Sequence, residues 1–182
     1  MSLTGKWIEL TYKVATGDWR TRFIIAPIAA ACYLSLIVVI IFLSFFVDKS
    51  LGLPNVFWYP WGLIVGICLL ILGIFLSFIS IVYFIRVMGT PVPFCPPPEL
   101  VSGGPYMFAR NPMLTGLFIS LFGIGIVLGS LSLFFIFTPL FIAVNVWEVK
   151  KVEEPELVRR LGQEYVEYRN RTPMFFPFRI KK

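Results

Sequence analysis

The sequence predicts an all-α, polytopic membrane protein with four transmembrane helices, the last two forming a helical hairpin, and an amphipathic interfacial helix at each terminus. Two observations predict this class. The 182-residue chain is 58% hydrophobic and only 14% charged, whereas roughly a quarter of the residues in a soluble domain are charged. Charges are also absent from three long runs, 23–47, 50–85 and 111–147. Such uncharged apolar runs are typical of helices that satisfy their own backbone hydrogen bonds inside the bilayer.

The N-terminal segment, 1–22, is expected to form a short helix in the headgroup region. Trp7, Leu10 and Val14 recur at helical spacing with lysines beside them, which is the pattern of a helix lying in the membrane interface. No small-residue cleavage site follows a short apolar core, so we expect no cleavable signal peptide.

Two spans should follow, from about Phe23 to Val47 and from about Tyr59 to Ile85, joined by a connector at 48–58. A charged, proline-rich stretch, 86–110, comes next.

The run 111–147 is too long for one helix without a break. We expect its turn at Gly129-Ser130-Leu131-Ser132, which leaves two arms of roughly 17 residues, near the lower limit for a span.

Pro155 should end or kink the last helix, because proline disfavours α geometry at the residue before it, Glu154. Beyond it, one amphipathic helix is expected, with an apolar stripe among charged residues: Leu157, Leu161, Tyr165 and Tyr168. The tail 174–178 is expected to return to the membrane surface.

Basic residues precede the first span, flank the 86–110 stretch and follow the fourth span, whereas the two opposite connectors together hold only Lys49. The positive-inside rule then predicts that both termini and the 86–110 stretch are cytoplasmic. This topology explains the net charge of +6. No nucleic-acid partner is expected, because no basic stripe interleaves with exposed aromatic residues.

Residue usage makes several kinds of chemistry poor candidates. Histidine is absent, which removes the commonest transition-metal ligand and the commonest general base. The three cysteines, Cys32, Cys68 and Cys95, are isolated and indicate neither a zinc site nor a disulfide framework. No metal is therefore expected.

Two cytoplasmic segments could carry function. The first, 89–113, is dense in proline and glycine, which restrict the backbone and permit close approach to a ligand such as an adenine or a ribose. A plain alternative is a loop that leads into a helix, with Asn111 as N-cap and Pro112 at the first helical position.

The second segment is the pair Glu153-Glu154. Adjacent carboxylates repel each other unless a cation balances them. Lys150 and Lys151 offer a structural balance. A cationic ligand, such as S-adenosylmethionine with its sulfonium and ammonium, is the functional alternative.

The chain contains an ordered series of motifs: Leu100-Val101, Gly104-Pro105-Tyr106, Arg110-Asn111-Pro112-Met113, the helical hairpin, Glu153-Glu154-Pro155, and Leu161-Gly162-Gln163-Glu164-Tyr165 followed by Tyr168. This order of motifs, over about 86–177, resembles the isoprenylcysteine carboxyl methyltransferase family, in particular its bacterial branch.

The resemblance implies S-adenosyl-L-methionine as cofactor and a set of residues that contact it: Pro98, Glu99, Leu100, Val101, Tyr106, Asn111, Pro112, Met113, Leu114 and Glu153. Two positions depart from the family, whose usual histidine is Asn111 here and whose usual tyrosine is Leu114. Asparagine keeps its hydrogen-bonding capacity and leucine does not. The substrate-handling arginine of the eukaryotic members is Val149 here, which weakens the case for a prenylated cysteine carboxylate as substrate.

These features predict an integral membrane methyltransferase that transfers a methyl group to a lipophilic carboxylate, amine or thiol at the cytoplasmic leaflet. Arg110, Glu153 and Glu154 are the catalytic candidates. Arg110 can hold an acidic headgroup, or it simply anchors the helix start. The partners expected are the lipid bilayer and the lipophilic substrate, in a bacterial inner membrane.

The chain 1–182 would form one domain with five parts. These are an interfacial segment (1–22), two spans (23–85), a cofactor loop (86–112), the hairpin (113–152) and a C-terminal cytoplasmic helix with its tail (153–182). A non-catalytic scaffold that keeps this fold is the rival hypothesis. A transporter would need polar residues deep in the spans, where Asn145 is the main example. Asn145 is expected to join helices.

Overall fold

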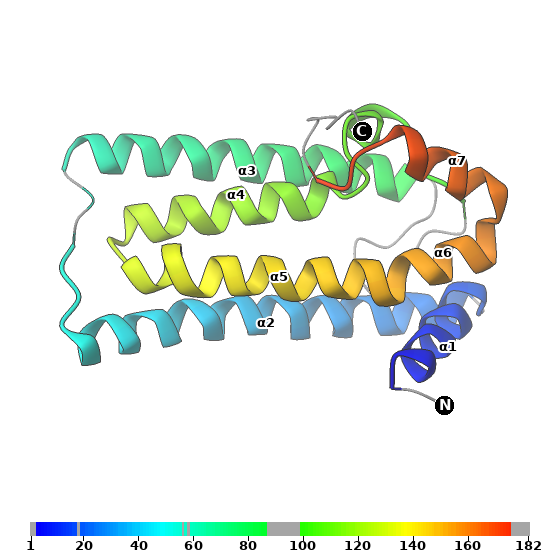
Figure 1. Ribbon diagram of the computed structural model, residues 1–182, viewed down its shortest axis with the longest axis horizontal. Helices are drawn as coiled ribbons and strands as arrows, with labels where there is room; N and C mark the ends of the chain where they lie inside the picture. Colours follow the sequence, from blue (N-terminus) through cyan, green and yellow to red (C-terminus); the bar gives the residue numbers. More distant parts are fainter. Residues whose placement is uncertain (1–2, 18, 56, 58, 87–98, 176–182) are drawn as a thin grey trace.

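The computed structural model of the chain describes residues 3–17, 19–55, 57, 59–86 and 99–175, and every regular element in these ranges is helical. The all-α prediction is confirmed. Figure 1 shows α2, α3, α4 and α5 running alongside one another, with α1, α6 and α7 gathered at one end. We call this the α7 end. The opposite end, the turn end, carries the α2–α3 connection and the turn between α4 and α5.

The first helix, α1, spans Leu3–Thr16, as the spacing of its apolar residues predicts. It is fastened to α6, because Arg159 Nη1 lies 2.9 Å from Glu9 Oε2. The same guanidinium lies over the Tyr12 ring, 4.1 Å from its centroid. Both contacts are at the α7 end, so α1 belongs to the polar part of the fold.

The first two predicted spans are both helices. Helix α2 covers Trp19–Leu51 and keeps Pro27 within it, and α3 covers Trp61–Arg86. The predicted connector at 48–58 starts too early, because α2 continues through Asp48 to Leu51. Asp48 stays helical while its carboxylate accepts hydrogen bonds from the Ser130 hydroxyl and, at 2.9 Å, from the Ser132 N–H. Asp48 therefore fastens the hairpin turn to α2.

The helical hairpin is present where the sequence predicts it. Helix α4 covers Pro112–Val127, and the turn passes through Gly129, whose φ of 68° is in the left-handed region that favours glycine. A π-helical turn, Leu133–Phe137, leads into α5, Thr138–Glu148.

Of the two outcomes predicted at Pro155, an end or a kink of the last helix, the end is wrong. The chain passes from α5 through a second π-helical turn, Val149–Glu153, directly into α6, Glu154–Leu161, with Pro155 in its first turn. Glu154 has φ −61° and ψ −43°, which is ordinary α geometry. Proline is tolerated in a first turn because its missing N–H has no helical partner there. The distortion falls instead in the π turn that precedes the proline.

The prediction of a single C-terminal amphipathic helix is also wrong, because the helix breaks at Gly162. Gly162 has φ 61° and ψ −133°, a conformation that only glycine adopts readily. It separates α6 from α7, Gln163–Arg171. The predicted stripe is nevertheless buried as one cluster, in which Leu157, Tyr165 and Tyr168 pack with Leu100 and Leu161.

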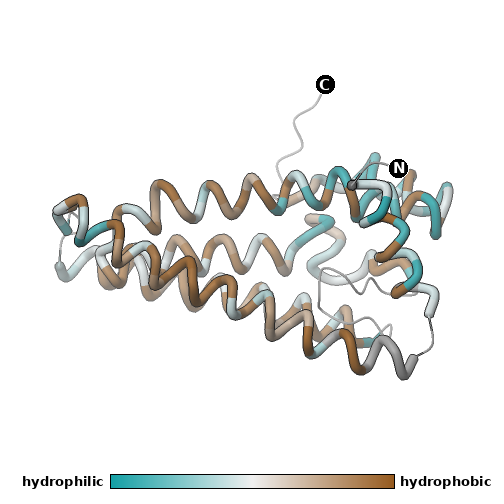
Figure 2. Tube along the Cα trace, turned by 90° about the horizontal axis from the view of Figure 1, so that it is seen from below, coloured by the Kyte–Doolittle hydropathy of each residue, from teal (hydrophilic) through white to brown (hydrophobic). Residues whose placement is uncertain are grey.

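Three of the described helices are long and apolar enough to cross a membrane: Pro27–Leu51, Trp61–Arg86 and Leu133–Leu161. Helix α4, with 16 residues, is shorter than the roughly 17 residues of the shortest spans. Figure 2 shows hydrophobic residues along the long helices and hydrophilic ones concentrated at the α7 end. The chain is an integral membrane protein, and a fourth span through α4 stays a prediction.

Small residues let α4 pack closely on α3. A Cβ atom added at Gly73 would lie 2.4 Å from the Gly116 carbonyl oxygen, and one added at Gly116 would lie 2.5 Å from the Gly73 carbonyl oxygen. Such small-residue contacts are the usual means of close helix packing in membranes. This seam holds the start of α4 against α3 at the α7 end.

The C-terminal segment is fixed to the start of α4. The Arg110 N–H donates to the Pro173 carbonyl at 2.8 Å, and the Asn111 N–H donates to the Met174 carbonyl at 3.0 Å. Met174 and Phe175 then pack against the core between the helices. The rest of the tail that was predicted to return to the membrane surface, 176–178, lies outside the described residues.

Candidate active site

The segment before the hairpin and the helices behind it meet in one cavity at the α7 end. The first segment contributes Glu99, Leu100, Val101, Tyr106, Arg110 and Asn111. The second contributes Val149, Glu153, Leu157, Leu161, Tyr165 and Tyr168, and Phe84 of α3 completes the wall. The hairpin brings these residues together by returning the chain to the end from which it left.

Tyr106 is held in the wall from two sides. It lies in a short 3-10 helix, Gly104–Met107, and its side chain is only 4% exposed. Its carbonyl accepts a 2.7 Å hydrogen bond from the Tyr168 hydroxyl of α7. The Tyr106 hydroxyl lies 3.5 Å from the Ser80 carbonyl, longer than an ordinary O–H···O bond.

Tyr106, Tyr165 and Tyr168 give the cavity an aromatic, hydrogen-bonding wall. Burial raises the pKa of each phenol above its usual value near 10. The three hydroxyls therefore stay protonated at physiological pH and serve as neutral donors.

Glu153 brings a carboxylate into this wall without a partner. It is half-buried, and no described residue forms a hydrogen bond or an ion pair with it. Three other carboxylates, Glu148, Glu154 and Glu156, and one cation, Arg110, lie near enough to act on it electrostatically. A carboxylate in such surroundings favours an incoming cation.

Glu154, the next residue, is paired. Its Oε1 lies 2.5 Å from Arg110 Nη1, and both side chains are about one-tenth exposed, at 12% and 11%. Arg169 Nη1 approaches Glu154 Oε2 at 3.9 Å. The cations expected to balance the acidic pair, Lys150 or Lys151, are therefore replaced by Arg110 and Arg169, whose ion pairs are with Glu154.

The π turn Val149–Glu153 gives Glu153 and Glu154 their different surroundings. A π turn closes its hydrogen bonds between residues five apart, and here the Glu154 N–H reaches the Val149 carbonyl. Val149 and Glu153 both line the cavity, whereas Glu154 faces Arg110. Single π turns are frequent at functional sites.

The structure brings together most of the residues predicted from the resemblance. Glu99, Leu100, Val101, Tyr106, Asn111 and Glu153 all line the cavity, as does the catalytic candidate Arg110. Asn111 is the N-cap residue of α4 and Pro112 is its first residue, as the sequence predicts, but the Asn111 side chain makes no capping hydrogen bond.

Three predicted residues lie elsewhere. Pro112 is fully buried, and Leu114 packs in the core with Phe118 and Leu121. The Met113 carbonyl accepts a 3.1 Å hydrogen bond from the Ser77 hydroxyl. None of the three lines the cavity, Pro98 lies outside the described residues, and a cofactor role for these four stays a prediction.

The sequence does not predict a functional role for every residue of the cavity wall. The sequence places Tyr165 and Tyr168 in an apolar stripe and in a family motif but predicts no contact with the cofactor for them. It also predicts no cofactor contact for Phe84, Val149, Leu157 or Leu161. The available signal was the stripe itself, because two of its members are tyrosines whose hydroxyls need partners when buried.

The space that these walls enclose is about 40 Å³, room for one or two water molecules. Sites for small organic ligands span roughly 300–1,000 Å³. The space between the described walls is therefore smaller than a bound nucleoside needs.

Comparison with known families places this geometry in context. The family model described as phospholipid methyltransferase matches residues 61–164, which is more than half of the chain and includes α3, the hairpin and most of the cavity wall. No curated protein and no solved structure matches the chain. The resemblance to membrane methyltransferases of the isoprenylcysteine carboxyl methyltransferase type is confirmed, while the bacterial branch stays a prediction. The chain belongs to the phospholipid methyltransferase family.

Proposed function

We propose that this protein is a membrane methyltransferase that uses S-adenosyl-L-methionine and methylates a lipophilic acceptor at the cytoplasmic leaflet. Family membership supports the reaction class. In this proposal α4 is the fourth span, both termini are cytoplasmic, and the α7 end faces the cytoplasm of a bacterial inner membrane. The excess of basic residues at that end supports the orientation.

The observation that carries the proposal is the unpaired Glu153 carboxylate in a wall of apolar and aromatic side chains. A ligand that fits must offer a positive charge to Glu153 and a flat or apolar surface to Tyr106, Leu100 and Val101. S-adenosyl-L-methionine has an ammonium, a sulfonium and an adenine, so the residues present fit it.

In the proposed complex Glu153 pairs with the ammonium, and Glu99, Leu100, Val101, Tyr106 and Asn111 surround the nucleoside. The bound cofactor supplies a methyl group already activated by its sulfonium. The protein then has to align the acceptor with that group, since orientation alone provides much of the acceleration. Closure of the 99–111 segment over the site excludes water.

Arg110 and Glu154 act as positioning residues in this proposal. Their ion pair connects the residue before Asn111 to the residue after Glu153, so it fixes the two segments that carry these side chains. Arg110 Nη1 is engaged by Glu154, whereas its buried Nε atom has no hydrogen-bond partner among the described residues.

Incubation of purified protein and native lipid extract with methyl-labelled cofactor tests the proposal. The wild type should yield a labelled lipophilic product, and Glu153→Ala or Tyr106→Ala should abolish labelling while the protein stays folded. Glu164→Gln, which changes an exposed carboxylate of α7, is the matched control and should keep full labelling.

The rival is a scaffold that kept the fold and lost the chemistry. The departures at Asn111 and Leu114 motivate it. Folded wild-type protein that neither binds the cofactor nor labels any lipid would favour the scaffold and defeat the enzyme proposal.

A further inference from the structure

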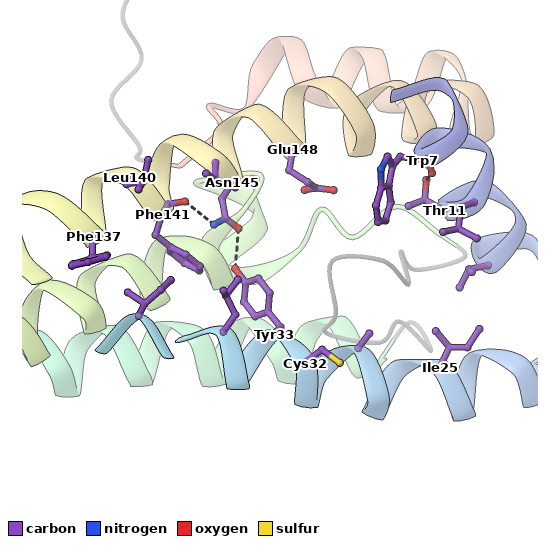
Figure 3. A pocket seen from close by; sticks show the side chains of 16 residues that line it. Trp7, Thr11, Ile25, Cys32, Tyr33, Phe137, Leu140, Phe141, Asn145 and Glu148 are labelled. Atoms are coloured by element: carbon purple, nitrogen blue, oxygen red, sulfur yellow. Dashed lines mark hydrogen bonds between the residues drawn. The ribbon is translucent and has the colours of Figure 1, made fainter. Parts of the chain in front are cut away.

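A second and larger cavity, about 850 Å³ in volume, lies between α1, α2 and α5. Figure 3 shows it from close by, with Tyr33 and Cys32 on one side and Asn145 and Glu148 on the other. Its volume is within the range of sites for small organic ligands. Its wall is almost entirely apolar and includes Val14, Ile25, Leu36, Ile40, Phe137 and Leu140. Such a wall suits an aliphatic chain.

The polar groups in the middle of this cavity satisfy one another. The Tyr33 hydroxyl donates to Asn145 Oδ1 at 2.8 Å, and Asn145 Nδ2 donates to the Phe141 carbonyl, also at 2.8 Å. Asn145 thus joins α5 to α2, as the sequence predicts. These groups need no ligand.

Glu148 differs from them. Its Oε1 atom is buried and has no hydrogen-bond partner. Figure 3 shows its side chain extending from α5 toward Trp7 of α1. No lysine or arginine is among the described residues of this wall. Glu148 as a whole is half-buried. A buried carboxylate oxygen without a partner is expensive to maintain, and a cation that enters the cavity relieves the cost.

Glu148 also sits next to the candidate active site. It precedes the π turn that presents Glu153 to the other cavity, and the two carboxylates lie near enough to interact electrostatically. The part of the large cavity that contains Glu148 therefore adjoins the site proposed for the cofactor, and an apolar part extends away from Glu148 along α2 and α5.

We propose that the large cavity binds an aliphatic amine that carries no phosphate beside its nitrogen. The ammonium pairs with Glu148, and the chain lies between α2 and α5 toward Phe137. That stretch of helix, from Glu148 to Phe137, rises about 16 Å. The proposal rests on the proposed function for the fate of the bound amine, but binding can be measured without the cofactor.

The charge of the wall argues against two other acceptors. A fatty carboxylate would place a second negative charge beside Glu148. A phospholipid amine would place its phosphate within a few bonds of the same carboxylate, with no described basic side chain in the wall to balance it. In apolar surroundings like charges at such distances repel strongly.

The test uses a photoactivatable alkylamine, with a diazirine at the end of its chain, and the full-length protein in nanodiscs without cofactor. Cross-linked peptides should come from α2 and α5. Dodecylamine should compete about tenfold or more better than dodecanol, dodecanoate or lysophosphatidylethanolamine, since an ionic hydrogen bond in an apolar site is worth at least that factor.

Two variants test whether Glu148 and the apolar wall are responsible for binding. Glu148→Gln should bring the four competitors within a few-fold of one another, while Glu164→Gln keeps the preference for the amine. Ala29→Phe, which adds bulk to the wall, should reduce cross-linking by all probes. Three results would overturn the proposal. The first is that all four competitors displace the probe equally well from the wild type, and the second is that lysophosphatidylethanolamine displaces it better than dodecylamine. The third is that Glu148→Gln keeps the wild-type preference for the amine. Cofactor binding that persists in such a case would leave the proposed function standing.

Discussion

Glu153 and Glu154 are neighbours in the sequence and have different surroundings in the fold. Glu154 is paired with Arg110 and approached by Arg169, whereas Glu153 lines the cavity with no described partner. The sequence predicts an acidic pair that needs a cation. It does not show which of the two is already balanced, because that depends on a π turn and on an arginine more than forty positions away.

The Arg110–Glu154 pair should behave as a buried structural ion pair. Arg110→Met or Glu154→Leu alone should lower the free energy of unfolding by about 3–5 kcal/mol, because the first leaves Glu154 with only the 3.9 Å contact to Arg169 and the second leaves Arg110 without its ion pair. The double variant should lose less than either single variant. Denaturant unfolding in mild detergent measures the cycle, and additive losses would show that the two side chains do not act as a pair.

Tyr168 should act through Tyr106. Tyr168→Phe removes the 2.7 Å hydrogen bond to the Tyr106 carbonyl, so it should cost about 1 kcal/mol of stability and weaken cofactor binding a few-fold. Tyr59→Phe, at an exposed position of the turn end, is the control and should change neither. Equal behaviour of the two variants in both assays would refute this role.

At the scale of elements, the contact between α3 and α4 holds the site in place. Gly73 and Gly116 meet at the seam, with Gly66 and Gly123 in a second close approach nearer the turn end. The start of α4 carries Asn111, and α3 carries Phe84, so a shift between these helices would move both walls of the cavity.

A larger side chain in this seam should force α3 and α4 apart. Gly73→Val is expected to lower the thermal midpoint by many degrees and to weaken cofactor binding, because its side chain would meet backbone atoms of α4. Cys68→Val changes an exposed residue of the same helix and should leave both properties unchanged. A tolerated Gly73→Val would contradict the close packing.

The elements show how far sequence reasoning reaches. Uncharged runs predict α2, α3 and the hairpin, because hydrocarbon leaves a helix as the only way to pair the backbone. The break at Gly162 and passage through Pro155 were missed, because a glycine or a proline is compatible with more than one local geometry. The π turns were missed because they depend on the helices packed around them.

The candidate site, too, can be predicted from the sequence only in part. Its residues from Glu99 to Asn111 and Glu153 follow from the order of motifs, since a hairpin must return the chain to the end it left. Glu148 was missed, although it is the first charge after the run 111–147 and an ionisable residue at the end of a span is a functional candidate. Its lack of a partner emerges only when α1, α2 and α5 are assembled.

The whole molecule has a polar end and an apolar body. Basic and acidic side chains concentrate in α1, α6 and α7, while the turn end is fastened by Asp48 and the serines of the hairpin turn. The proposed four-span topology with both termini in the cytoplasm is compatible with this polarity, and it requires α4 to cross despite its 16 residues.

Cysteine labelling tests this topology. In a background that lacks Cys32, Cys68 and Cys95, a membrane-impermeant thiol reagent added outside intact cells should label Ser50→Cys and Leu128→Cys. Gln163→Cys should be labelled only after the cells are opened. Labelling of Gln163→Cys from outside would show that the orientation is the reverse of the proposed one. If Leu128→Cys is not labelled from outside, α4 does not cross the membrane.

The most direct test of the central claim is equilibrium binding of labelled S-adenosyl-L-methionine to the folded protein in nanodiscs. We expect saturable binding that weakens about tenfold or more in Glu153→Gln, where a charged partner becomes neutral, and that persists in Glu164→Gln. If the folded wild type does not bind the cofactor, or if Glu153→Gln binds it as tightly as the wild type, the cavity between the 99–111 segment and α6–α7 is not the cofactor site.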